Sequence, residues 1–137
     1  MIVVDTNILV PLFISGPRSA DAARLLRQDR VWCTEPLALV ELINIFATYQ
    51  RSKLLTADAA NRHLGEAEHL LTPYLHAVER RRALEFAARF KVSGYDAHFL
   101  ATAHYCGKRL ITEDSKLRVA APALTQSIAD ALAYNRP

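Results

Sequence analysis

The chain is poor in the residues that build disulfide scaffolds, flexible linkers and membrane spans. Its 137 residues include two cysteines, four glycines and six prolines, which excludes a disulfide-rich secreted domain and a disordered linker. Cys33 and Cys106 lie far apart in the sequence and lack the C-x-x-C spacing of a metal or redox pair, so we expect plain buried thiols. The longest apolar stretch, Ile8 to Ile14, is far shorter than the ~20 residues that cross a bilayer.

Two further absences narrow the class of protein. The N-terminus has no basic segment and reaches an acidic residue at Asp5, so we expect no signal peptide, no membrane segment and a cytoplasmic protein. The five histidines show no zinc-binding spacing. The hydrophobic content of 51% and the charged content of 23% are ordinary for a globular protein. We therefore expect residues 1–137 to form a single domain with its own core.

The net charge of +3 conceals an uneven distribution of charge. If four of the 14 acidic side chains gather in one site, 17 basic side chains face ten acidic ones elsewhere, a net charge of about +7. A basic exterior around an acidic site suits a polyanion such as RNA, although an arginine-rich solvated surface is equally compatible with these counts. The run from Arg80 to Arg82 is open to the same two interpretations.

Short β-branched runs alternate with segments of helical periodicity. Strands are expected at residues 2–4, 31–33, 74–78, 109–112 and 123–127. Helices are expected from Ile8, over 18–30, 37–49, 56–71 and 79–91, and from Ser93 to a C-terminal glycine at Gly107. The 37–49 segment is apolar nearly all round, which predicts a buried helix. The alternation predicts an α/β fold with a parallel sheet covered on both faces.

Four carboxylates occupy positions that this fold would bring together. Asp5 follows the first strand and Asp114 follows the strand that ends at Thr112, so parallel strands place both at one edge of the sheet. Asp96 lies in the first turn of a helix, where the helix dipole favours negative charge. Glu41 lies within an apolar helix, where an ionised side chain needs a partner.

Three of these acids also have an ordinary structural interpretation. Asp5 could cap the helix that follows it, Asp96 could form a capping box with Ser93, and Asp114 could cap a turn before Lys116. Glu41 has no comparable local role, which makes it the acid most strongly associated with function.

Four motifs in order along the chain resemble the PIN-domain ribonucleases, and among them the small VapC-type toxins of toxin–antitoxin systems. The motifs are Val-Val-Asp-Thr-Asn at residues 3–7, Thr-Glu-Pro-Leu at 34–37 leading to Glu41, Tyr-Asp-Ala-His-Phe-Leu-Ala-Thr-Ala at 95–103, and Leu-Ile-Thr-Glu-Asp at 110–114. No motif is specific by itself, but the four together at these separations are a strong signal.

The resemblance implies a three-layer α/β/α fold with a mostly parallel sheet of four to five strands. It implies a divalent-metal endoribonuclease in which Asp5, Glu41, Asp96 and Asp114 are the catalytic and metal-binding acids. The side chains that would support them by hydrogen bonding are Thr6, Asn7 and Thr112. Glu113 adds a second acid beside Asp114, which leaves open which of the two reaches the metal.

The resemblance also implies partners and a mode of action. An RNA substrate, a cognate antitoxin protein and a homodimer are expected, and the amphipathic faces around Leu64 and Leu71 are compatible with dimerisation. The expected reaction is hydrolysis of RNA phosphodiester bonds by metal-activated water, which leaves a 5′-phosphate and a 3′-hydroxyl and needs no histidine base.

Electrostatics explains why such a site requires a cation. Four carboxylates within ~6 Å of one another form six repulsive pairs, each costing roughly 3 kcal/mol at an effective dielectric near 20. That sum rivals the ~5–15 kcal/mol stability of a whole domain, so the cluster needs protons or a metal ion. Ligands that are all oxygen select hard ions, which favours Mg²⁺ or Mn²⁺.

Three other functions fit parts of the sequence. A phosphoacceptor signalling domain would place two adjacent acids after its first strand, whereas Asp5 stands alone there. A catalytically inactive PIN domain that binds RNA would lack a carboxylate, and none is missing. A housekeeping RNA-processing PIN nuclease would have the same site; the small size of the chain favours the toxin, and an antitoxin reading frame directly upstream would distinguish the two.

Overall fold

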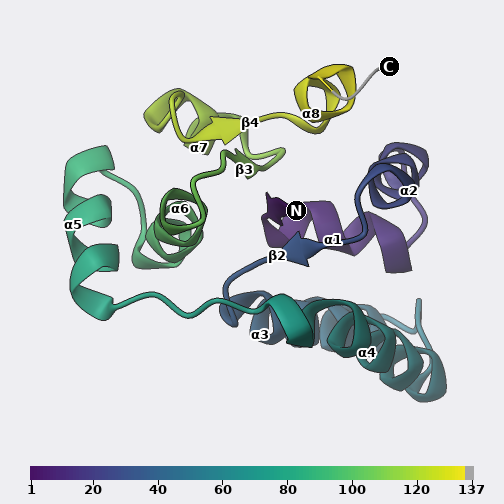
Figure 1. Cartoon of the computed structure of the whole chain (residues 1–137). Helices are drawn as coiled ribbons and strands as arrows, with labels where there is room; N and C mark the ends of the chain where they lie inside the picture. The colour runs from purple at the N-terminus through teal and green to yellow at the C-terminus, as the bar shows by residue number, and fades with distance from the viewer. Residues whose placement is uncertain (135–137) are drawn as a thin grey trace.

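A four-stranded parallel sheet lies at the centre of the computed structural model, which describes residues 1–134 (Figure 1). The strands are β1 (Ile2–Val4), β2 (Trp32–Cys33), β3 (Leu110–Ile111) and β4 (Thr125–Gln126), in the spatial order β2-β1-β3-β4. Every pairing is parallel, and Val3 is aligned with Cys33 on one side and Leu110 on the other. The last two strands are shorter than the predicted segments 109–112 and 123–127.

Helices cover both faces of this sheet and give three layers, α/β/α (Figure 1). They are α1 (Thr6–Phe13), α2 (Ser19–Gln28), α3 (Leu37–Arg51), α4 (Ala57–Leu71), the 3₁₀ turn η1 (Thr72–Tyr74), α5 (Arg80–Phe90), α6 (Gly94–Tyr105), α7 (Ser115–Ala120) and α8 (Ile128–Tyr134). In Figure 1, α5 and α6 lie on one side of the strands, α1 and α2 on the other, and the α3–α4 pair beyond β2. None of the described helices is long and apolar enough to cross a membrane.

Side chains at the helix ends explain where several helices begin. Asp5, Thr56, Ser93 and Asp114 are N-caps, and each side chain accepts a hydrogen bond from a backbone N–H of the first turn. At the other end of α6, Gly107 adopts a φ of +64°, as expected for a glycine that follows a helix. These local signals were readable in the sequence.

The predicted strand at 74–78 is wrong. The chain forms the 3₁₀ turn η1 and then a single parallel bridge between Thr34 and Leu75, with the His76 N–H donating to the Thr34 carbonyl. Because β2 ends at Cys33 and the chain turns into α3 three residues later, the segment has one residue to pair with rather than a strand.

The prediction of a buried helix at 37–49 is also wrong, although the helix exists. Only one face of α3 is buried, through Ala38, Leu42 and Phe46, while Val40 and Ile43 are about half exposed. The faces of α4 that the sequence suggested for dimerisation are not exposed apolar surfaces. Leu71 is fully buried, and Leu64 packs against the core. Apolar surface is therefore available on α3 and not on that side of α4.

The two cysteines are brought together by the fold. Cys33 at the end of β2 is buried and Cys106 at the end of α6 is partly buried, and their Sγ atoms lie 3.7 Å apart as free thiols. Burial raises the pKa of the Cys33 thiol to about 12. The two residues are free thiols without a disulfide between them, and the fold makes them neighbours.

Helix α6 must be anchored firmly because it carries Asp96, and Leu100 is one of its fully buried side chains. We expect Leu100→Ala to lower the free energy of unfolding by about 2–5 kcal/mol, the usual cost of a large-to-small change in a core. Leu84→Ala is the matched control, because Leu84 is 71% exposed on α5. Urea denaturation of both variants measures the difference; equal losses would contradict this account of the core.

Candidate active site

Four carboxylates from four separate segments line one cavity. The cavity has a volume of about 420 Å³, and Asp5, Glu41, Asp96 and Asp114 all contribute to its wall. Arg18 lies on the same wall. The structure thus brings together all four acids that the sequence singled out, although they span more than a hundred residues of chain.

Strand order explains how the segments meet. Because β1 and β3 are parallel neighbours, the residues that follow them emerge side by side: Asp5 follows β1, and Thr112 follows β3. The backbone N–H of Asp5 donates to the carbonyl of Ile111 at 3.0 Å, which continues the pairing by one residue. Glu41 and Asp96 reach the same cavity from α3 and α6.

The hydroxyl of Thr112 is the centre of a hydrogen-bond network at this edge of the sheet. It donates to Asp5 Oδ2 at 2.7 Å and accepts from the Asp114 backbone N–H at 3.1 Å. The Asn7 amide donates to the same hydroxyl at 3.0 Å and to Asp5 Oδ2 at 3.2 Å. These contacts tie the two strand ends together and leave Asp5 little freedom to rotate.

The third expected supporting residue, Thr6, acts on a different acid. Its hydroxyl donates to Glu41 Oε1 at 3.2 Å, across 35 positions of sequence. This bond, with the packing of α1 on α3, directs Glu41 toward Asp5.

The structural interpretations of the acids are partly correct at the same time. Asp5 Oδ1 accepts from the Thr6 N–H, and Asp114 Oδ1 accepts from the N–H groups of Lys116 and Leu117. Asp96 also takes the position expected of a capping box: its N–H donates to the Ser93 hydroxyl, and a side-chain hydrogen bond with Ser93 opposes the rise in its pKa. Capping therefore helps to fix Asp5, Asp96 and Asp114 in place, and leaves Glu41 as the acid without a structural role of that kind.

Burial and mutual repulsion both disfavour negative charge in this cavity. Burial is the largest effect on Asp5 and raises its pKa to about 6, with the Asp96 and Asp114 charges adding to the rise and the bonds from Thr112 and Thr6 opposing it. Burial also raises the pKa of Glu41, and the Asp5 charge raises it further. The pKa of Asp96 is raised by burial and then by Asp114. The protein alone thus leaves the acidic cavity in need of a cation.

The oxygen donors of this cavity fit a hard divalent ion in chemistry. In arrangement, however, no three carboxylates, thiols or imidazoles within residues 1–134 form a group placed to hold a metal ion. Mg²⁺ does not require such a group, because it is commonly bound by one or two carboxylates and keeps several of its waters. Asp5, Asp96, Asp114 and Glu41 are the residues that would hold it.

Glu113, which the sequence left ambiguous, does not line the cavity. Its Oε1 accepts from the N–H of Ile128 at 2.8 Å, and its Oε2 lies 3.4 Å from Arg18 Nε and 3.9 Å from Arg118 Nη1. The side chain is only 13% exposed, so this position is well defined. Asp114, rather than Glu113, is the acid that faces the cavity.

Arg18 is a residue of this cavity that sequence reasoning missed. Its side chain is 54% exposed and lies on the cavity wall, with Nε paired to Glu113. No local motif predicts a role for Arg18, which directly precedes α2 in the sequence. The fold places it beside the four acids.

Comparisons with known proteins agree with the fold. The PIN domain family model matches residues 2–122. The chain is 31% identical over 126 residues to Ribonuclease VapC3 from Pyrobaculum aerophilum, covering 90% of this chain and 96% of that protein. The crystal structure of PAE2754 from the same organism superposes with a TM-score of 0.71 at 20% identity, covering 97% of this chain and 94% of that one, a likeness of fold.

The raised pKa of Asp5 makes the stability of the metal-free protein depend on pH. The folded state holds a proton on Asp5 up to about pH 6, whereas the unfolded chain releases it near 3.8, so stability is lost as the pH rises between these values. We expect a loss of about 3 kcal/mol from this group, measured by urea denaturation in EDTA. The Asp5→Asn variant is the control, because it should show a flatter profile over the same range; identical profiles would contradict the assignment.

Proposed function

Because the chain belongs to the PIN-domain family, we propose that it is a Mg²⁺- or Mn²⁺-dependent endoribonuclease whose active site is the cavity of Asp5, Glu41, Asp96 and Asp114. The observation that carries this proposal is the convergence of four carboxylates from four distant segments on one cavity where burial has raised the pKa of Asp5 to about 6. None of the four acids forms an ion pair within residues 1–134, and the charges of neighbouring acids raise the pKa values of Asp5, Glu41 and Asp96.

The four acids of the cavity would hold the metal ion in two pairs. Asp5 and Asp114, held by Thr112 and by their own capping bonds, form the fixed part of the metal-binding set. Glu41 and Asp96 face them from α3 and α6 and complete it. The ion, when bound, would lower the pKa of water and neutralise the charge that develops on the phosphate during hydrolysis.

Arg18 would bind the RNA backbone beside the scissile bond. Its Nε lies 3.4 Å from Glu113 Oε2 and its side chain lines the cavity, while its terminal N–H groups form no ion pair in the described part of the chain. A guanidinium fixed at one nitrogen is well suited to a phosphate oxygen, because little freedom is lost on binding.

The biological role we propose is that of a toxin controlled by a cognate antitoxin. Support comes from the match to Ribonuclease VapC3 over nearly the whole length of both chains. A housekeeping RNA-processing nuclease is the alternative with the same site. Induction of the gene with and without its upstream neighbour separates them, since a toxin arrests growth only in the absence of its antitoxin.

We also propose that the domain extends over residues 1–137 and that it forms a homodimer. Although the family model ends at residue 122, β4 pairs with β3 and α8 packs against α2, so the later segments belong to the same core. Ile43 on α3, which is half exposed and lines neither the acidic cavity nor the cavity at the start of α3, is apolar surface that supports self-association. Sedimentation velocity measures it.

Metal dependence and the role of Glu41 are tested together. We expect RNA cleavage with Mg²⁺ or Mn²⁺, no cleavage in EDTA, and a loss of about 100-fold or more in Glu41→Gln, since even residues behind the direct ligands cost 10–100-fold. In EDTA, the melting temperature of Glu41→Gln should equal or exceed that of the wild type, because a repulsive charge is removed. A large drop in melting temperature with activity retained would contradict the assignment.

Arg18→Ala should weaken RNA binding more than it slows the bound reaction. We expect KM to rise several-fold with a smaller change in kcat, and the slope of log affinity against log salt to become shallower by about 0.7, the value for one lost phosphate contact. Arg27→Ala is the matched control, since Arg27 is exposed on α2, the helix that Arg18 precedes, and lies outside the cavity. Equal effects of the two substitutions would show that only general charge matters.

A further inference from the structure

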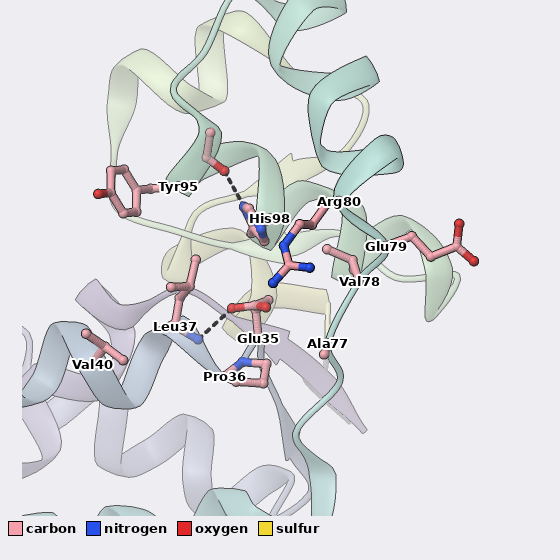
Figure 2. Close-up of a pocket in the computed structure, with 11 residues that line it drawn as sticks. Glu35, Pro36, Leu37, Val40, Ala77, Val78, Glu79, Arg80, Tyr95 and His98 are labelled. Carbon is pink, nitrogen blue, oxygen red and sulfur yellow. Dashed lines mark hydrogen bonds between the residues drawn. The ribbon is translucent and has the colours of Figure 1, made fainter.

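A second, larger cavity adjoins the acidic one. It has a volume of about 760 Å³ and lies between the start of α3, the segment 77–80 and the start of α6 (Figure 2). Leu37, Val40 and Val78 give it apolar walls, and Tyr95 and His98 contribute two rings. The proposed reaction does not use this cavity.

The two cavities lie along the same two helices, α3 and α6, although no residue lines both. On α3, Leu37 in the second cavity precedes Glu41 in the first by four residues, a rise of about 6 Å along the helix. On α6, Tyr95 and His98 of the second cavity flank Asp96 of the first. A strand of RNA with a phosphate at the acids would therefore have a neighbouring base within reach of the second cavity.

A buried carboxylate at the base of the second cavity is only half satisfied. Glu35 is 5% exposed, and its Oε2 accepts from the N–H of Leu37. Its Oε1 has no hydrogen-bond partner in the described part of the chain. That oxygen is open to the cavity, since the only sealed, unpartnered side-chain nitrogen or oxygen within residues 1–134 is Nδ1 of His63. A buried acceptor that faces a cavity can bind a hydrogen-bond donor of a ligand in that cavity.

A cation faces Glu35 without pairing to it. In Figure 2 the guanidinium of Arg80 points toward the Glu35 carboxylate, yet no ion pair within 4.0 Å joins them in the described structure. His98 stands beside them with Nδ1 2.5 Å from the Gly94 carbonyl, which holds its ring against α6. The cavity thus presents an acceptor and a donor on facing sides, with flat and apolar surfaces around them.

This combination selects among the four RNA bases. An ionised carboxylate only accepts hydrogen bonds, so it favours a base edge that presents two adjacent donors. Guanine has such an edge, with N1–H and N2–H side by side, whereas the Watson–Crick edges of adenine, cytosine and uracil each place a single donor group beside an acceptor. Arginine is the common donor to guanine O6. Single-stranded RNA is read in this manner, by hydrogen bonds to base edges and by stacking on rings.

We propose that this second cavity binds a guanine base of the RNA substrate, with Glu35 accepting from its N1–H and N2–H groups and Arg80 donating to O6. The proposal rests on the proposed function for its biological meaning, since it assigns a base preference to the same active site. The binding itself does not require catalysis and is measured separately.

The first experiment is a titration of metal-free, isotope-labelled protein with the four nucleoside 5′-monophosphates, followed by NMR. The phosphate and ribose are common to all four, so differences report on the base. We expect GMP to shift the amide signals of Leu37, Val78 and Tyr95 and to bind at least five-fold more tightly than AMP, CMP or UMP. Equal binding of the four, or no shifts because a second copy of the chain covers the opening, would overturn the proposal.

Three variants test the assigned contacts. Glu35→Gln keeps an acceptor for the Leu37 N–H but turns a donor toward the base, so GMP affinity should fall about ten-fold and the preference over AMP should disappear. Arg80→Gln, at an exposed position, should weaken GMP binding without disturbing the fold. Glu68→Gln is the matched control, because Glu68 is exposed on α4 and lines neither cavity, so its loss of charge should leave binding unchanged. Loss of binding in Glu68→Gln, or full retention in Glu35→Gln, would contradict the proposal.

Cleavage of RNA provides a readout that separates this proposal from the proposed function. Cut sites mapped in a random RNA pool should carry a guanine at one fixed position, and Glu35→Gln should lose that preference. Cleavage without any base preference, together with equal nucleotide binding, would remove the guanine site and leave the nuclease. Selective GMP binding without cleavage under any metal condition would do the reverse.

Discussion

A carboxylate buried at the end of a β-strand has to be surrounded by hydrogen-bond donors, and the rest of this site follows from how Asp5 meets that requirement. Donors reach it from the Thr6 backbone, the Asn7 amide and the Thr112 hydroxyl. Two of these belong to the turn that opens α1, and the third belongs to the neighbouring strand end. The hydrogen bonds that Asp5 accepts therefore fix the end of β1 against the end of β3. Because Thr112 also binds the Asp114 N–H, the same bonds fix the position of Asp114.

The same residues stabilise the fold and build the site, which constrains how either can change. Asp5 and Asp114 begin helices with one carboxylate oxygen, and they belong to the acidic cavity as well. A substitution at either position removes a cap worth about 1 kcal/mol along with a site acid. Glu41 has no capping role, so effects of substitution there report on the cavity more directly.

Much of this arrangement was predictable, because its signals are local. The four acids sit in short motifs, the caps at Ser93 and Asp114 follow from residue type and spacing, and the alternation of elements predicted a parallel sheet. What could not be predicted depends on neighbours distant in sequence. The exposure of Val40 depends on where α4 packs, and the 74–78 segment had the composition of a strand but a single pairing residue.

Arg18 and Glu35 show the same limit within the functional region. No motif contains Arg18, and although Glu35 belongs to the Thr-Glu-Pro-Leu motif at residues 34–37, that motif gave it no role of its own. Their interest arises only from the cavities in which the fold places them. The roles proposed for these two residues depend on the tertiary structure, which places them in the cavities.

Glu113 connects the site to the far end of the chain. Its backbone N–H is bound by Asn7, its Oε1 receives the first N–H of α8, and its Oε2 attracts Arg18 and Arg118. One side chain thus joins the loop of Asp114 to a helix that begins beyond the part of the chain matched by the family model. The segment of α8 therefore supports the loop that carries Asp114, so a truncation near residue 122 would loosen the acidic cavity while leaving all four acids in the sequence.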